Sequence, residues 1–142
     1  MSAQHHFCIS NPYRSAVGVA PAELFPAQVE DVFNHLESLA KDDQLYEAGE
    51  AKPTPENIDW AKRVLLRIIP RYYLVGAEID AFRGEIHVSW ENGNKRVVAF
   101  LPAPDQLKLY YERTKENGEV EHDLRPGNDP WMINAVLKWL YA

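Results

Sequence analysis

Apolar residues recur at steps of three and four in two segments near the start of the chain. Residues 26–41 predict an amphipathic helix with a narrow apolar stripe, and the polar residues 42–53 predict a loop. A second helix begins after Thr54, which can cap its first turn, and Pro55, whose fixed φ suits that turn. It ends at Pro70 and carries a wide apolar arc, typical of a helix packed across a sheet. The arc consists of Ile58, Ala61, Val64, Leu65, Ile68 and Ile69.

After Arg71 the apolar residues recur at every second position instead of every third or fourth. This change predicts an antiparallel meander of five strands. The strands are expected at residues 72–82, 85–91, 95–101, 107–113 and 119–124. Arg83-Gly84, Asn92-Gly93 and Asn117-Gly118 mark tight turns. If the first two are two-residue loops, two rows of residues lie opposite one another across three strands. These rows are Asp80, His87 and Val98, and Glu78, Ser89 and Arg96.

Alternation also assigns the faces of the predicted sheet. The helices should cover the face that carries Ile86, Val88 and Trp90, together with Val75, Ala77, Ile79, Ala81, Val97, Ala99, Leu101, Leu107, Leu109 and Tyr111. A closing helix is expected after Asp129, its cap, and Pro130, and it buries Ile133, Val136, Leu137 and Leu140.

The predicted fold class is therefore α+β: two N-terminal helices, a five-stranded antiparallel meander and a C-terminal helix. We expect one domain over residues 1–142. It would comprise an extended arm at 1–20, an acidic helix and loop at 21–55, and a helix, sheet and final helix at 56–142.

The charge of the chain is concentrated at its beginning. The formal net charge is −6, and residues 1–55 carry eight acidic against three basic residues. A pI near 5.3 argues against nucleic acid as a partner, because phosphate binding requires a basic face. We expect a cytoplasmic protein with no membrane contact, since no apolar run reaches the ~20 residues of a membrane span and no signal peptide is recognisable. Cys8 is the one cysteine, so it has no internal disulfide partner.

Catalytic chemistry has one candidate location. No nucleotide-binding, serine hydrolase, zinc-protease or EF-hand motif is present, and we expect no cofactor. The predicted register gathers Asp80, Glu85, His87 and Glu91 on the face of the sheet away from the helices. Such a group could hold a divalent metal for hydrolysis or could be ordinary surface electrostatics, and the second interpretation is favoured. His122, between Val120 and Leu124, is expected to be half-buried at the sheet edge.

Two surfaces are candidates for binding a partner. Trp60, Arg63 and Arg67 form a stripe on the second helix, and Trp and Arg are enriched at interfaces. Alternatively, Trp60 packs at the edge of the core and Asp59 pairs with Arg63, or the acidic first helix lies against these arginines. The second surface is the outer face of the sheet, which carries Leu74, Phe82, Val98, Phe100 and Tyr110. Either the N-terminal arm or another chain should cover it.

The hairpin sequence also permits a comparison. The segment Gly84-Glu85-Ile86-His87-Val88-Ser89-Trp90 follows a helix that ends near Pro70 and precedes a Lys-Arg-Val-Val-Ala-Phe strand. This arrangement resembles a loose group of uncharacterised small bacterial proteins over residues 56–113, and it implies no particular function.

Taken together, these features predict a non-enzymatic module that binds another protein or its own copy as a homodimer. Bacterial proteins that neutralise a toxin or another effector have this general composition. The competing prediction is a metal-assisted hydrolase centred on His87, with Asp80 and Glu85.

Overall fold

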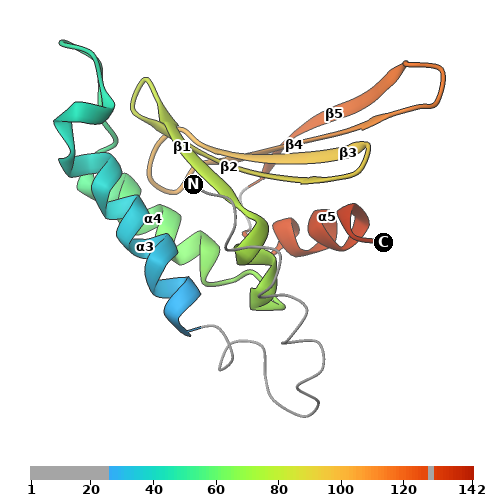
Figure 1. Cartoon of the computed structure of the whole chain (residues 1–142), viewed down its shortest axis with the longest axis horizontal. Coiled ribbons are helices and arrows are strands. Elements are labelled where there is room, and N and C mark those ends of the chain that lie inside the picture. Colours follow the sequence, from blue (N-terminus) through green and yellow to red (C-terminus); the bar gives the residue numbers. More distant parts are fainter. Residues whose placement is uncertain (1–25, 128–129) are drawn as a thin grey trace.

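Within the described residues, two α-helices precede the sheet, as the sequence predicts. The computed structural model describes residues 26–127 and 130–142, with α3 at Pro26–Lys41 and α4 at Pro55–Leu65 (Figure 1). The hydroxyl of Thr54 accepts a hydrogen bond from the backbone N–H of Asn57 at 3.1 Å, and Pro55 occupies the first turn. Both are the capping features expected of a helix start. The short 3-10 helix η2 (Asp43–Leu45) lies in the loop between the helices. The predicted N-terminal arm and the predicted Asp129 cap lie outside the described residues.

Helix α4 is shorter than predicted. It ends at Leu65, whereas the sequence suggested that it continues to Pro70. The residue before a proline is disfavoured in the helical conformation, and the backbone N–H of Ile69 donates instead to Asn134 Oδ1 at 2.8 Å. Ile68 remains buried, but Ile69 is exposed, so its predicted place in the apolar arc is wrong.

The segment after Pro70 also differs from the prediction. Residues Arg71–Gly76 form the 3-10 helix η3, and the first strand, β1, covers Glu78–Phe82 alone. A 3-10 helix has three residues per turn, so the two-residue alternation assumed for this segment does not hold. Leu74, predicted to lie on the outer face of the sheet, is therefore buried in the core.

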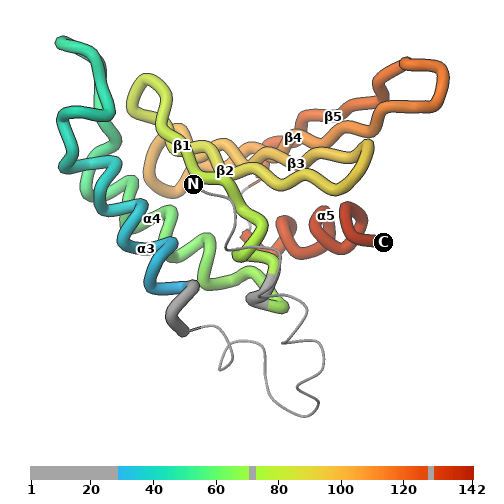
Figure 2. Tube along the Cα trace, in the orientation of Figure 1, coloured from blue at the N-terminus to red at the C-terminus, as the bar shows by residue number. Residues whose placement is uncertain are grey.

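The sheet is a five-stranded antiparallel meander in the order β1-β2-β3-β4-β5. After β1 come β2 (Glu85–Asn92), β3 (Lys95–Leu101), β4 (Leu107–Thr114) and β5 (Val120–Gly127). The last strand is longer than predicted. Figure 2 shows the β4–β5 hairpin extending past the end of the C-terminal helix α5 (Met132–Leu140) in this view.

The register between β1 and β2 is confirmed, but that between β2 and β3 is wrong by two residues. Asp80 lies opposite His87, as expected from the two-residue turn Arg83-Gly84. His87, however, lies opposite Phe100 rather than Val98, because the second turn consists of Gly93-Asn94. Gly93 has φ +60° and takes the first central position, where a type II′ turn favours glycine. The shift is an even number of residues, so every side chain stays on its predicted face.

The core lies between the sheet and the helices. Ile86, Val88 and Trp90 are buried, as predicted, and Ile133, Leu137 and Leu140 of α5 pack in the same core. Helix α4 contacts β2, α5 contacts β3, and α3 packs against α4 and β1. Within the described part of the chain, the α-helices α3, α4 and α5 lie on the same side of the sheet (Figure 1).

Asn134 joins α5 to the segment that follows α4. Its Oδ1 accepts from Ile69 N, and its Nδ2 donates to the backbone oxygen of Arg67, both at 2.8 Å. One amide side chain of α5 thus satisfies two backbone groups just after α4.

Candidate functional site on the outward face of the sheet

The outward face is the surface formed by strand side chains that point away from the helices. Its centre is apolar: Val98 is buried by its neighbours, while Phe100 and Tyr110 are half-buried. Phe82 on β1 and Leu124 on β5 are each 53% exposed. Apolar side chains therefore extend from one edge strand of the sheet to the other.

Aromatic contacts order this centre. The His87 ring meets the Phe100 ring edge-on, with 4.8 Å between centroids, because the two residues are directly opposite in the register. Phe82 lies 6.3 Å from the His87 ring. On the other side of the face, the rings of Tyr110 and His122 stack at 6.0 Å. These ring contacts restrict the orientations of the aromatic side chains on the outward face.

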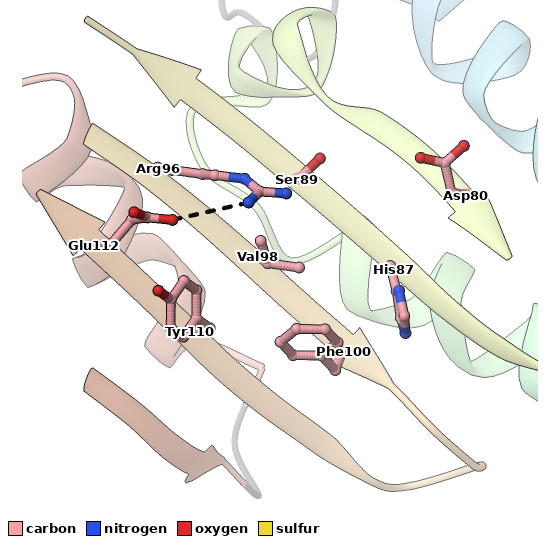
Figure 3. A pocket seen from close by; sticks show the side chains of 8 residues that line it. All are labelled: Asp80, His87, Ser89, Arg96, Val98, Phe100, Tyr110 and Glu112. Carbon is pink, nitrogen blue, oxygen red and sulfur yellow. Dashed lines mark ion pairs between the residues drawn. The ribbon is translucent and has the colours of Figure 1, made fainter. Parts of the chain in front are cut away.

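A hollow of about 330 Å³ lies at the middle of the outward face. Figure 3 shows side chains from four neighbouring strands around it. It is lined by Asp80, His87, Ser89, Arg96, Val98, Phe100, Tyr110 and Glu112. The structure thus brings together five predicted site residues: Asp80, His87, Val98, Phe100 and Tyr110.

Glu112 was not singled out from the sequence, and Arg96 was predicted only as part of a cross-strand row with Glu78 and Ser89, yet the two residues form one side of the hollow. Arg96 lies opposite both Glu91 and Glu112 in the register, and its guanidinium nitrogens are 3.7 Å and 3.8 Å from their carboxylates. The positive charge of Arg96 is therefore shared by two acids (Figure 3 shows the Glu112 pair).

The outward face is acidic overall. Its acidic residues are Glu78, Asp80, Glu85, Glu91 and Glu112, and its basic residues are Arg96 and Lys108. Glu78 and Asp80 are exposed on β1, and neither forms an ion pair within residues 26–127 and 130–142. Unneutralised negative charge is thus concentrated at the β1 side.

The predicted group of Asp80, Glu85, His87 and Glu91 is only partly assembled. His87 Nε2 lies 3.3 Å from Glu85 Oε1, and Asp80 is the cross-strand neighbour of His87. Glu91 is four residues after His87 on β2, where it contacts Arg96 instead. In the part of the chain that the structure describes, no three His, Cys, Asp or Glu residues are arranged to hold a metal ion. His122, predicted to be half-buried, is exposed on the outward face of β5.

The other predicted surface is partly internal. Trp60 is 7% exposed, and its Nε1 donates to the backbone oxygen of Gln106 at 2.8 Å, so this side chain packs at the edge of the core. The guanidinium of Arg63 lies 5.5 Å from the Trp60 ring, and its carboxylate neighbour is Asp105 at 3.9 Å, not Asp59. Arg67 donates to the backbone oxygen of Arg63 at 3.0 Å. Partner binding by Trp60, Arg63 and Arg67 stays a prediction, with little of Trp60 available for it.

The acidic first helix contacts a lysine rather than these arginines. Glu37 of α3 accepts a hydrogen bond from Lys62 of α4 and also pairs with Lys41 at 3.2 Å. These two ammonium groups hold the pKa of the Glu37 carboxyl below its usual value, the Lys62 hydrogen bond contributing most. The helix pair is therefore joined by this ion pair next to its apolar contacts.

Comparisons with family models, curated proteins and solved structures find no match to this chain. Within the described residues, no helix has the length and apolar content that crossing a membrane requires.

Proposed function

We propose that this protein is a protein-binding module whose outward face docks on a basic surface of another protein. The observation that carries the proposal is the apolar centre of that face, flanked by Phe82 and Leu124 at 53% exposure. Covering about 400 Å² of apolar area would contribute about 10 kcal/mol before the costs of association. Contiguous exposed apolar patches on a folded protein usually mark a site that binds another molecule.

Charge selects the kind of partner. The five carboxylates of the outward face outnumber its two cations, and Arg96 is already shared by Glu91 and Glu112. A lysine or arginine of the partner that enters the hollow would meet the Asp80 carboxylate and the Phe100 ring, which both line it. Ion pairing and cation–π attraction then act on the same group.

The proposal is tested by capture with matched variants. The full chain is immobilised, a lysate of its native cells is passed over it, and the retained protein is then produced recombinantly for titration. Phe82→Glu should abolish binding, whereas Leu45→Glu should not, because Leu45 is similarly exposed (51%) but lies in the α3–α4 loop.

A second variant pair tests the charge. Asp80→Lys should weaken binding at least tenfold at low salt, and the effect should shrink as salt is added. Asp59→Lys on α4 makes the same change away from the outward face and should leave the affinity unchanged. If no retained protein is sensitive to Phe82→Glu and Asp80→Lys, the proposed function is wrong.

A further inference from the structure

The two edge strands of the sheet differ in whether another part of the chain bonds to their outer backbone groups. At the β1 edge, His35 of α3 donates from Nε2 to the backbone oxygen of Ile79 at 2.8 Å, so a helix side chain occupies the edge. At the β5 edge, no strand or side chain among the described residues bonds to the outer backbone groups. An open edge strand is a template for pairing with another chain.

Hydrogen-bonded and non-hydrogen-bonded residue pairs alternate along β4 and β5. This alternation shows which backbone N–H and C=O groups of β5 point to the open edge of the sheet. Lys115 N donates to Glu119 O at 2.7 Å, which makes that pair hydrogen-bonded, and the next pair, Thr114 with Val120, is then non-hydrogen-bonded. Thr114 N accordingly donates to Asn94 O on the other side, at 2.9 Å.

Continued along the strand, the same alternation leaves the N–H and C=O of Val120, His122 and Leu124 pointing to the open edge. Pro126 falls in the same series, where its missing N–H costs no bond to β4. The strand therefore offers three donors and four acceptors to a neighbouring strand.

We propose that two copies of this chain pair antiparallel through β5, with Leu124 opposite Leu124 of the second copy. The two meanders would then form one continuous sheet with their outward faces on the same side. The pairing leaves the outward face open, so it does not depend on the docking function proposed above.

Charge complementarity selects this register from its neighbours. With Leu124 at the twofold axis, Asp123 lies opposite Arg125 of the second copy, and the same contact occurs twice. Centring the pair on Asp123 would bring the two Asp123 carboxylates together, and centring it on His122 would place Glu121 opposite Asp123. The Leu124 register is the one of the three that opposes no like charges.

The outward face supports the same register. Val98, Tyr110 and Leu124 lie in one cross-strand row, so Leu124 at the axis joins this row to its copy. The exposed Leu124 side chain gains an apolar neighbour there. Each copy thus places its Leu124 side chain beside that of the other copy, and the outward face itself stays open.

Cysteine cross-linking tests the register directly. In a chain with Cys8→Ser, Leu124→Cys should form an intermolecular disulfide under mild oxidation, because hydrogen-bonded antiparallel pairs place their Cα atoms about 5.5 Å apart. His122→Cys is the matched control. Its Cα would lie about 14 Å from its copy, four residues away along the strand, so it should not cross-link.

Association is measured by sedimentation equilibrium on the full chain. Arg125→Asp should raise the dimer dissociation constant at least tenfold, and Asp123→Arg/Arg125→Asp, which restores the opposite charges, should recover the dimer. Circular dichroism verifies that the variants fold, and recovery in the double variant separates lost pairing from lost folding. The proposal is overturned if the wild-type chain is monomeric up to about 1 mM. It is also overturned if His122→Cys cross-links as well as Leu124→Cys.

Discussion

Replacing Trp90 with phenylalanine should separate the hydrogen bond of this core residue from its apolar packing. The side chain is 1% exposed, and its Nε1 donates to the backbone oxygen of Tyr73 at 2.9 Å. This bond joins β2 to η3, the segment where strand alternation fails. Phenylalanine keeps an aromatic ring in the core but has no N–H to offer the Tyr73 carbonyl.

Two costs of this substitution can be worked out. Removing the indole N–H breaks its hydrogen bond to the Tyr73 carbonyl, which costs about 1–3 kcal/mol. The phenylalanine side chain is smaller by about 40 Å³, and at about 24 cal/mol per Å³ of residual cavity this adds about 1 kcal/mol. Trp90→Phe should therefore lower the free energy of unfolding by about 2–4 kcal/mol, and Trp90→Ala by about 3–5 kcal/mol.

Urea denaturation followed by far-ultraviolet circular dichroism measures both variants. The slope m should stay unchanged, so that the midpoint alone reports stability. Phe82→Ala is the control, because this aromatic residue is largely exposed and its loss should cost less than about 0.5 kcal/mol. A Trp90→Phe protein as stable as the wild type would refute both the bond to Tyr73 and the tight packing around the indole.

Three further changes test other parts of the fold. Asn134→Ala removes both hydrogen bonds that tie α5 to the end of α4 and should cost about 1–3 kcal/mol of unfolding free energy in urea, while Asn134→Asp, which keeps the acceptor for Ile69 N, should cost less. Thr54→Ala should cost about 1 kcal/mol in the same assay, and Thr54→Ser, which keeps the capping oxygen, should be close to wild type. The pKa of Glu37 is lowered in the folded chain, so its stabilising contribution is complete above the ordinary value of 4.5 and is lost as the pH falls through the lowered pKa. Lys62→Met should return that pKa toward its ordinary value in an NMR titration, and an unchanged titration would show that Lys62 is not the cause.

The elements that the sequence predicts best are those bounded by specific backbone chemistry. Thr54 and Pro55 locate the start of α4 because a cap and a first-turn proline have few other uses. Arg83-Gly84 fixes the β1–β2 register because both residues adopt positive φ in a two-residue turn. Burial of Trp90 followed from alternation alone.

The errors arise where the pattern does not distinguish two structures. Residues 72–76 are apolar or small without alternation, so a strand and a 3-10 helix fit them equally well. The turn after β2 can begin at Asn92 or at Gly93, and both choices place every side chain on the same face.

The hollow on the outward face was predictable only in part, for a related reason. Asp80 and His87 are brought together by a tight turn, whereas Arg96 meets Glu112 across strands joined by residues 102–106. A loop of this length does not fix a register, so the sequence could not bring Arg96 and Glu112 together.

Strand β5 has a composition that bears on how the folded chain opens. Its inward positions hold Glu121, Asp123 and Arg125, and the strand has no buried residue before Gly127. Detaching β5 from β4 therefore exposes little apolar surface, whereas detaching β2 or β3 would expose the core. In the monomeric chain, the free energy of this local opening should be well below that of global unfolding, and β5 amides should exchange with solvent long before those of β2. In the monomer, β5 is thus the strand of the meander whose detachment we expect to leave the rest of the protein folded.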